Sequence, residues 1–297
     1  MKRNSRSRIP LIPPLTRLGE LPVADFLRDY WQQQPLLVRQ AFPGFELPLS
    51  ADELAGLACD TDTSRLVLER GGQKPWELRP GPIPEPDFAT LPETHWTLLV
   101  NDCEKLVPEL QALVQPFRFI PDWRIDDLMI SYAAPNGSVG PHVDAYDVFL
   151  LQARGQRRWQ ISTQPCEPDN FLPGLDLRVM RAFQPEQEWV LEPGDMLYLP
   201  PGVPHYGVAV DECMTCSIGF RAPSQAELLE QLLGHLVEQP AQNRRFTDPN
   251  RPLQDDPTRI SDADLEHLTD LLMSALPDRV AVRCWLQETL GSRPGSN

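Results

Sequence analysis

The chain has 297 residues, 41% of them hydrophobic, and a formal net charge of −15 at pH 7. This length and apolar content predict one large globular core with a smaller extension. The acidic balance argues against direct binding of nucleic acid, because such surfaces neutralise phosphates with clustered Lys and Arg, and it favours a basic partner instead.

The expected compartment follows from signals that are missing from the sequence. No uninterrupted apolar run approaches the roughly 20 residues needed to cross a bilayer, and the basic start MKRNSRSR precedes no signal-peptide core. Six cysteines are spread through a chain too long to depend on disulfides, which suits a reducing compartment. We therefore expect a cytoplasmic protein without a membrane partner, in which Cys213 and Cys216 of the one C-x-x-C are small strand residues.

The N-terminal region is expected to contain a tail, one helix, one strand and a loop. Residues 1–20 are predicted to form a flexible tail, and the apolar spacing over 22–34 predicts a helix that ends before Pro35. The short apolar run over 36–38 predicts a strand. The proline-rich stretch 79–87, RPGPIPEPD, predicts an irregular surface loop.

Residues 96–220 carry short β-like runs separated by Pro and Gly turns. The runs are WTLLV, LMISYAA, DVFLLQA, RRWQIS, EWVLEPG, DMLYLP and MTCSIGF. Many short strands with such punctuation predict an all-β barrel or jelly roll. After Pro223 the β pattern stops, and helices are predicted over 225–237, 262–276 and 278–290, the first opened by a capping box of Ser224 and Glu227. The expected fold class is therefore mainly β with a helical extension.

Two segments, GPHVDAYDVFLLQ and EPGDMLYLPPGVPH, carry candidate metal ligands. Side chains alternate along a strand, so His142 and Asp144 of H-V-D are expected to point together into the barrel. His205 follows an apolar strand and a rigid Pro-Pro-Gly turn, which suits a ligand from a neighbouring barrel strand. Two histidines and one carboxylate form the facial triad of non-haem Fe(II) oxygenases, which leaves metal positions open for O2. We therefore predict that these three residues hold Fe(II).

Arg157 is the candidate anchor for an organic cosubstrate. In R-R-W-Q-I, it shares one strand face with Trp159 and Ile161, so it is buried if they are. A buried guanidinium requires an anionic partner, and the distal carboxylate of 2-oxoglutarate would supply one through a bidentate pair. The alternative is that Arg157 is an ordinary surface charge.

Together these segments resemble a known family. FLRDYWQQQPLLV, PDWRIDDLMIS, GPHVDAYDVFLLQ, RRWQI, EPGDMLYLPPGVPH and SIGFRAP, within residues 22–290, are similar to JmjC-type ribosomal oxygenases, among them bacterial arginine hydroxylases of a large-subunit ribosomal protein. The resemblance implies a cupin-like JmjC catalytic domain, a double-stranded β-helix, over 21–222 and a helical dimerisation domain over 223–297. It also implies that Arg157 and Ser131 bind 2-oxoglutarate beside the iron ligands.

A substrate pocket is expected beside the metal. Asp127 and Met129 share a strand face with Ser131, Tyr146 continues the face of Asp144, and Ser217 lies on the strand after the last ligand. Asp127 would receive a guanidinium, Met129 and Tyr146 would line its aliphatic stem, and Ser217 would add a hydrogen bond. The alternative is plain barrel packing, which costs most for Asp127 because an interior carboxylate needs a partner.

The expected activity is hydroxylation of an arginine side chain in a basic ribosomal protein, with decarboxylation of 2-oxoglutarate to succinate and CO2. One alternative is a JmjC histidyl hydroxylase or lysine demethylase, which Asp127 discriminates because an imidazole pocket needs no carboxylate. Another is a non-catalytic cupin-like binding module, which would produce no succinate.

Assembly is the last expectation. Leucines on the first two C-terminal helices offer more apolar surface than a short extension covers, and a homodimer, which the resemblance also implies, would bury it. These leucines are Leu228, Leu232, Leu236, Leu265, Leu268 and Leu272. The alternative is that the helices cap the barrel of their own chain. Many bacterial relatives continue into a winged-helix domain, which we expect this sequence, ending at Asn297, to lack, naturally or by truncation.

Overall fold

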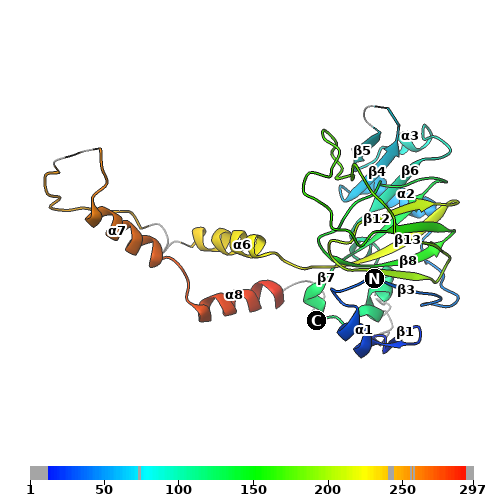
Figure 1. Cartoon of the computed structure of the whole chain (residues 1–297), viewed down its shortest axis with the longest axis horizontal. Helices are drawn as coiled ribbons and strands as arrows, with labels where there is room; N and C mark the ends of the chain where they lie inside the picture. Colours follow the sequence, from blue (N-terminus) through cyan, green and yellow to red (C-terminus); the bar gives the residue numbers. More distant parts are fainter. Residues whose placement is uncertain (1–12, 73–74, 240–243, 255, 257, 292–297) are drawn as a thin grey trace, which may run out of the picture. The chain divides into compact units, whose positions relative to one another are not determined.

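The computed structural model describes residues 13–72, 75–239, 244–254, 256 and 258–291. The chain divides into two compact units, Met1–Ala222 and Pro223–Asn297. Figure 1 shows that strands make up most of the first unit and that the second is helical. The predicted fold class, mainly β with a helical extension, is confirmed.

Two antiparallel sheets form the first unit. The large sheet has eight strands in the order β3-β11-β8-β13-β7-β6-β4-β5, and the small one has the order β10-β9-β12. The large sheet comprises β3 (Leu36–Val38), β4 (Ser64–Glu69), β5 (Trp76–Pro80), β6 (Trp96–Val100), β7 (Ile125–Ala133), β8 (Asp147–Arg154), β11 (Met196–Leu199) and β13 (Cys213–Phe220). The small sheet comprises β9 (Arg157–Ile161), β10 (Gln187–Leu191) and β12 (His205–Ala209), and a separate ribbon pairs β1 (Arg17–Leu18) with β2 (Leu21–Pro22).

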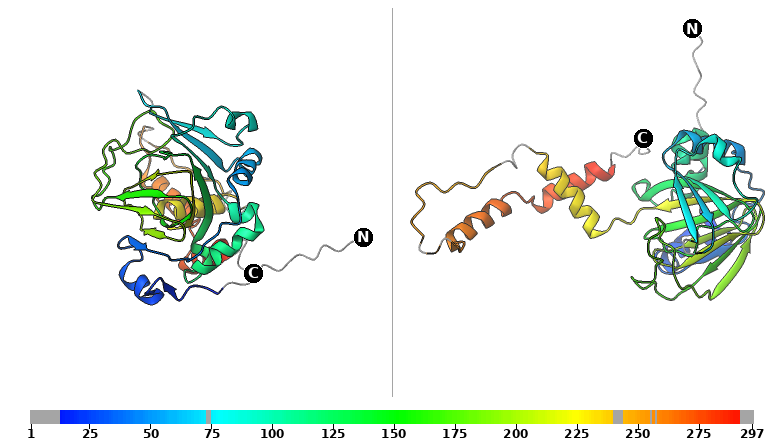
Figure 2. Two further views of the ribbon diagram at one scale, coloured as in Figure 1. Left: turned by 90° about the vertical axis from the view of Figure 1, so that its right-hand side faces the viewer. Right: turned by 90° about the horizontal axis from the view of Figure 1, so that it is seen from above.

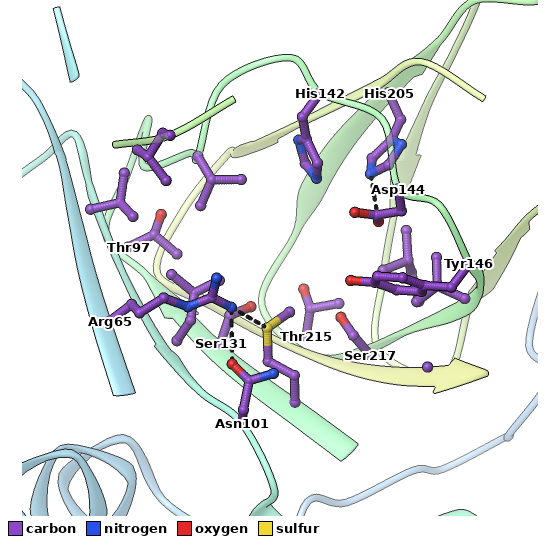
Figure 3. Close-up of a pocket in the computed structure, with 18 of the residues that line it drawn as sticks. Arg65, Thr97, Asn101, Ser131, His142, Asp144, Tyr146, His205, Thr215 and Ser217 are labelled. Atoms are coloured by element: carbon purple, nitrogen blue, oxygen red, sulfur yellow. Dashed lines mark hydrogen bonds and ion pairs between the residues drawn. The ribbon is translucent and has the colours of Figure 1, made fainter. Parts of the chain in front are cut away.

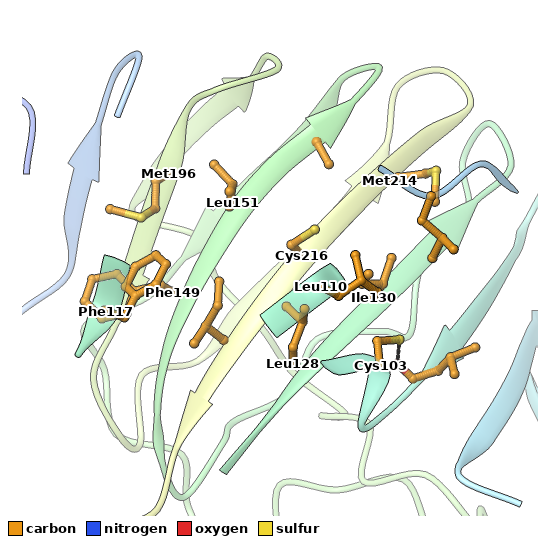
Figure 4. Packing of buried hydrophobic residues seen from close by; sticks show 14 of the residues in the cluster. Cys103, Leu110, Phe117, Leu128, Ile130, Phe149, Leu151, Met196, Met214 and Cys216 are labelled. Atoms are coloured by element: carbon orange, nitrogen blue, oxygen red, sulfur yellow. Dashed lines mark hydrogen bonds between the residues drawn. The ribbon is translucent and has the colours of Figure 1, made fainter. Parts of the chain in front are cut away.

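The two faces of the large sheet are covered differently. Its inner face packs against the small sheet through a cluster that joins Leu150 and Leu197 to Trp159 and Ile161. Its outer face carries the main core, where helices and turns cover residues such as Phe149 (Figure 4). Because β8 and β13 are covered on both faces, they are buried almost along their whole length, whereas β9 alternates buried and exposed residues.

Short helices supply the outer cover of the large sheet. They are α1 (Val23–Asp29), α2 (Ala51–Asp60), α3 (Glu85–Phe88), α4 (Cys103–Leu106) and α5 (Gln111–Val114), with 3-10 turns η1 (Pro108–Leu110), η2 (Gln115–Phe117) and η3 (Asp122–Arg124). A capping box between Ser50 and Glu53 opens α2. The main core thus lies on the outer face of the large sheet, and the pocket lies between the two sheets.

Three predictions for the N-terminal third need correction. The tail expected over 1–20 is shorter, since β1 pairs with β2 and Leu18 is buried, while residues 1–12 lie outside the described residues. The helix expected over 22–34 ends at Asp29, because Gln32 adopts a left-handed conformation and its amide donates to the Tyr198 hydroxyl.

The proline-rich stretch 79–87 also contains regular structure. Pro80 ends β5, which is an edge strand where a missing N–H costs no ladder hydrogen bond. Pro84 precedes α3 and Pro86 lies in its first turn, where proline is tolerated. The six cysteines are free, and Cys213 and Cys216 are buried residues of β13.

The second unit contains α6 (Gln225–Val237), α7 (Asp262–Met273) and α8 (Arg279–Gly291). The predicted capping box of Ser224 and Glu227 is present at α6. The rings of His235 on α6 and Trp285 on α8 lie 6.3 Å apart, so these two helices are neighbours (Figure 2). Within the described residues, no helix is long and apolar enough to span a membrane.

A buried polar network ties the start of β8 to the outer layer. Asp147 is fully buried, and its carboxylate accepts hydrogen bonds from the Tyr198 hydroxyl at 2.6 Å, Gln32 Nε2 at 2.9 Å and Arg124 Nη2 at 3.2 Å. Each partner comes from a different part of the chain. The network therefore fixes the end of the segment that carries H-V-D.

We predict that Asp147→Ala destabilises the first unit by about 3 to 5 kcal/mol, because it leaves the largely buried Arg124 cation without its partner. Tyr198→Phe should cost about 1 kcal/mol, the value of one hydrogen bond. Urea unfolding followed by circular dichroism measures both. Asp25→Ala, which breaks an exposed pair with Arg28, is the control. Wild-type stability of Asp147→Ala would refute the role of this network.

Candidate functional site

A pocket of about 310 Å³ opens on the inner face of the large sheet. Its walls come from β4, β6, β7, β8, β9, β12 and β13 and from the segment 139–146 (Figure 3). All of the candidate site residues named from the sequence line it, namely Asp127, Met129, Ser131, His142, Asp144, Tyr146, Arg157, His205 and Ser217. The barrel thus brings together residues from distant parts of the chain.

Three of these side chains form a possible metal site. The nearest ligand atoms of His142, Asp144 and His205 all lie within 4.8 Å of one another. His205 Nε2 is 3.5 Å from Asp144 Oδ2, and the two imidazole ring centroids are 4.2 Å apart (Figure 3). This spacing suits one ion held from one side.

The backbone explains how the three residues meet, and it differs from the expectation. H-V-D does not lie in a regular strand, since β8 begins only at Asp147. Instead, His142 forms an isolated bridge in which its amide donates to the His205 carbonyl at 3.0 Å and the His205 amide donates back at 2.9 Å. The Asp144 carbonyl accepts from the amide of Gly202 at 2.8 Å. Strand alternation therefore does not place Asp144, whereas pairing with the His205 segment does.

Both histidines are oriented for metal binding. His142 Nδ1 lies 2.9 Å from the Gly140 carbonyl, and His205 Nδ1 lies 2.9 Å from the Val203 carbonyl. A carbonyl only accepts, so each ring carries its proton on Nδ1 and keeps the Nε2 lone pair free for a metal ion. Burial and the neighbouring His142 lower the pKa of His205, which favours its neutral, ligating form.

Arg157 is a buried cation for which the described residues supply no acidic partner. It is 5% exposed, and neither Nε nor Nη2 has a hydrogen-bond partner among the described residues. Its Cζ lies 5.7 Å from the ring centroid of Trp159 on the same face of β9. An uncompensated buried charge is costly, so this position fits an anion that enters the pocket.

Other polar atoms in the pocket also lack partners. Thr97 Oγ1 and Trp159 Nε1 are buried and unpaired within the described residues, and both residues line the pocket with Arg157. Ser131, 3% exposed, pairs in register with Thr215 on β13. These donors fit a carboxylate-bearing molecule. Arg157 is buried on the same face of β9 as Trp159 and Ile161, as the alternation in R-R-W-Q-I predicts.

The expected substrate residues lie in the same pocket. Asp127 is largely buried, which raises its pKa, and its Oδ2 accepts from Asn101 Nδ2 at 2.6 Å. Met129 and Ser217 are register partners on β7 and β13. Tyr146 is 39% exposed and stands beside Ser217 and Asp144 (Figure 3).

Sequence reasoning missed two polar residues of this wall. Arg65 on β4 donates to Asn101 Oδ1 at 2.9 Å, and Asn101 in turn holds Asp127. Neither residue lies in a motif, because their proximity to Asp127 depends on how β6 pairs with β4 on one side and with β7 on the other. His205 was expected on a neighbouring barrel strand, and it is the first residue of β12. The bounds of that strand were not predicted, since HYGVA has no clear apolar alternation.

Fold and donor set together define a class. A jelly-roll pocket that presents two histidine Nε2 atoms and one carboxylate, beside an unpaired buried arginine, is the arrangement of cupin-type metal-dependent oxygenases. Comparison with known proteins narrows this class. The JmjC domain model matches residues 112–228, and the model of the AraC-like ligand binding domain matches residues 183–283.

Curated relatives and solved structures agree with each other. The ribosomal protein uL16 3-hydroxylase of Escherichia coli is 37% identical over 265 residues, which cover 89% of this chain and 70% of the relative. A probable ribosomal oxygenase of Haemophilus influenzae is 35% identical, over 91% of this chain and 68% of the relative. The chain therefore belongs to the JmjC ribosomal oxygenases, which confirms the family resemblance.

Two solved structures extend the comparison to the fold. An X-ray structure of Escherichia coli YcfD superposes with a TM-score of 0.77 at 35% identity, covering 93% of this chain and 73% of that one. The structure of YcfD, a ribosomal oxygenase, in complex with cobalt and 2-oxoglutarate gives a TM-score of 0.73 at 36% identity, over 92% and 72% of the two chains. The cupin-like JmjC fold is thereby confirmed.

We predict that His142→Ala and Asp144→Ala each weaken binding of Co²⁺ by more than about 100-fold, since even the loss of outer partners of a ligand costs 10- to 100-fold. The thermal unfolding of the metal-free protein should change little, because neither side chain is a core contact. Calorimetric titration measures the affinity. His95→Asn, an exposed histidine away from the pocket, is the control. Wild-type affinity in both variants would refute the metal site.

Proposed function

We propose that this chain is an Fe(II)- and 2-oxoglutarate-dependent oxygenase that hydroxylates an arginine side chain of a large-subunit ribosomal protein. One observation carries the proposal: a single pocket contains a His-Asp-His cluster, a buried arginine without an anion and a largely buried aspartate. The similarity to a uL16 3-hydroxylase and the cobalt and 2-oxoglutarate complex of YcfD support it.

His142, Asp144 and His205 are proposed to hold Fe(II) on one side and to leave its other positions open. The bound iron would supply the activation of O2 that couples decarboxylation of 2-oxoglutarate, to succinate and CO2, with hydroxylation of a C–H bond. The protein contributes fixed Nε2 lone pairs and one negative charge. Because His205 is buried, its Nε2 is shielded from bulk water.

Arg157 is proposed to bind the distal carboxylate of 2-oxoglutarate, with Ser131 as a second donor. The guanidinium has free donors on Nε and Nη2, which are in the right relation for a bidentate pair with a carboxylate. The stacking of Arg157 near Trp159 limits its rotation. A cosubstrate held this way would keep one orientation toward the metal.

Asp127 is proposed to receive the substrate guanidinium. Met129 and Tyr146 would contact the aliphatic stem of the arginine, and Ser217 would add a hydrogen bond. A histidine or methylated lysine in the same place would leave Asp127 without a bidentate partner, so an arginine substrate is favoured over the other JmjC activities. The net charge of −15 suits a basic ribosomal protein as partner. We propose a cytoplasmic location, because ribosomal proteins are synthesised there.

We predict that Arg157→Ala raises the 2-oxoglutarate concentration needed for half-maximal turnover at least about 30-fold, because losing a buried charge pair costs about 2 kcal/mol or more. Succinate production measured against 2-oxoglutarate concentration tests this. Arg158→Ala, which removes the neighbouring exposed guanidinium, should behave as wild type. If the two variants have the same requirement, Arg157 is not the anchor.

The proposed substrate can be tested by mass spectrometry of ribosomal proteins incubated with the enzyme, Fe(II) and 2-oxoglutarate. We expect a mass gain of one oxygen atom on one arginine peptide of a large-subunit protein. Asp127→Ala should impair this hydroxylation far more than 2-oxoglutarate decarboxylation without substrate, because Asp127 contacts none of the candidate metal ligands.

Asp126→Ala is the matched control, since the adjacent carboxylate is outside the pocket and pairs with Arg221. Equal loss of hydroxylation and decarboxylation in Asp127→Ala would mean that Asp127 is structural. Absence of any modified arginine peptide would refute the proposed substrate, and absence of succinate would favour a non-catalytic binding module.

We further propose that the helices of the second unit form a homodimer. Neither α6 nor α7 contains a buried residue. On α7 the predicted Leu265, Leu268 and Leu272 are 45%, 39% and 64% exposed. On α6 the exposed residues are Leu229, Leu233 and Val237, whereas the predicted Leu228, Leu232 and Leu236 are half-buried. An apolar surface of this extent on two helices calls for a partner, and a second copy of the chain would cover it by a two-fold contact.

We predict a dimer at micromolar concentration in size-exclusion chromatography with light scattering. Leu268→Asp combined with Leu272→Asp should yield monomers that still bind metal, since His142, Asp144 and His205 belong to the first unit. The same light-scattering run on the unmodified chain is the reference. A monomeric mass for the unmodified chain would refute the dimer.

A further inference from the structure

Within the proposed arginine pocket, we infer that Asn101 and Arg65 are positioning residues. They hold Asp127 with one carboxylate oxygen turned toward a gap at Gly219, where the guanidinium of the substrate binds. The inference rests on the proposed function, because it concerns how the receptor for that guanidinium is held.

The carboxylate of Asp127 is held by one oxygen only. Asn101 Nδ2 donates to Oδ2 at 2.6 Å, and the Asp102 amide approaches the same oxygen at 3.5 Å. Among the described residues, no hydrogen bond reaches Oδ1. Since both oxygens of a carboxylate accept hydrogen bonds, Oδ1 keeps its capacity for a donor from outside the chain.

Arg65 fixes the direction of the Asn101 amide. Arg65 Nη2 donates to Asn101 Oδ1 at 2.9 Å (Figure 3). A guanidinium can only donate and an ionised carboxylate can only accept, so the amide oxygen faces Arg65 and the amide nitrogen faces Asp127. Donation therefore runs in one direction, from Arg65 through Asn101 to Asp127, and each hydrogen bond polarises the next.

Arg65 can hold the Asn101 amide because no carboxylate in the part of the chain that the structure describes forms an ion pair with it. Its second hydrogen-bond acceptor is Met129 Sδ, 3.8 Å from Nη2. Arg65 and Leu99 are register partners on β4 and β6, and Leu99 pairs with Ser131 on β7. The guanidinium of Arg65 thus reaches Asn101 across the inner face of the sheet.

The free oxygen of Asp127 lies beside Gly219 on the wall of the pocket. A Cβ atom built on Gly219 would lie 3.2 Å from Asp127 Oδ1 and 3.8 Å from Tyr146 Cε2. Any side chain there would occupy the gap between the carboxylate and the aromatic ring. Glycine in a strand often marks a close approach by another group, and a planar guanidinium in this gap would bond Oδ1 while it packs on Tyr146.

The hydrogen bond from Asn101 also opposes protonation of the Asp127 carboxylate. Burial raises the pKa of Asp127 and the charge of the nearby Asp126 raises it further, whereas the Asp102 amide lowers it by more than the Asp102 carboxylate raises it. The Asn101 hydrogen bond is the strongest influence that lowers this pKa. Asn101 therefore favours the ionised form, which is the form that attracts a guanidinium.

The test uses steady-state kinetics of the full chain with Fe(II), 2-oxoglutarate and a synthetic peptide carrying the arginine found by mass spectrometry. Asn101→Asp keeps the shape of the side chain but removes its donor, and Asn101→Ala removes the whole amide. We expect both to raise KM for the peptide by about 10- to 100-fold, the value of a hydrogen bond to a charged group, with a much smaller change in kcat and in KM for 2-oxoglutarate. Gly219→Ala should act in the same direction, and Arg65→Met less strongly.

Gln160→Ala is the matched control, because Gln160 Nε2 donates to the Glu188 carboxylate at the same 2.6 Å but outside the pocket. It should leave peptide kinetics unchanged. In an Asp127→Ala background, Asn101→Ala should raise KM no further, because the two residues act as one unit. Should Asn101→Ala fail to fold, Asn101→Asp and Gly219→Ala carry the test.

Two failures can be told apart. If Asp127→Ala raises KM for the peptide but both Asn101 variants keep the wild-type value, the positioning role is wrong while the proposed pocket stands. If Asp127→Ala itself keeps the wild-type KM, the proposed arginine pocket is wrong and this inference with it.

Discussion

The candidate metal site depends on two main-chain hydrogen bonds between His142 and His205. They join the segment before β8, in the large sheet, to the first residue of β12, in the small sheet. Because the backbones are paired, the two imidazoles are held at a ring-centroid distance of 4.2 Å by the barrel itself. Metal binding then does not have to assemble its ligands, which is the condition for a site with fixed open positions.

The pocket carries one charged side chain without a hydrogen-bond partner among the described residues, Arg157, and one that is hydrogen-bonded, Asp127. Arg157 is buried with free donors, whereas Asp127 is held by Asn101 at one oxygen and open at the other. A buried cation without a partner destabilises the empty protein, and an anion that pairs with it stabilises the folded state by mass action. Binding of an anion at Arg157 and the stability of the barrel are therefore linked, whereas the carboxylate of Asp127 is already held by a residue of its own chain.

Much of the site could be predicted from local sequence, but only where local rules decide the geometry. Arg157 lies on the buried face because β9 is a regular strand, so alternation in R-R-W-Q-I was sufficient. Asp144 joins the histidines by a different backbone path from the one expected, since H-V-D is tied to the His205 segment rather than extended in a strand. Asn101 and Arg65 were missed because their contacts depend on strand register, which an apolar pattern does not specify between strands far apart in sequence.

The close contact between Gly207 and Trp159 limits how this pocket can change in evolution or design. A Cβ atom on Gly207 would lie 2.7 Å from the Trp159 ring, whose centroid is 5.7 Å from Arg157 Cζ and 5.9 Å from the His205 ring centroid. Replacement of the glycine is tolerated only after the tryptophan has become smaller, whereas a smaller residue at position 159 needs no prior change. Substitutions at the two positions are thus tolerated only in a fixed order, and widening the pocket for a bulkier ligand has to begin with Trp159.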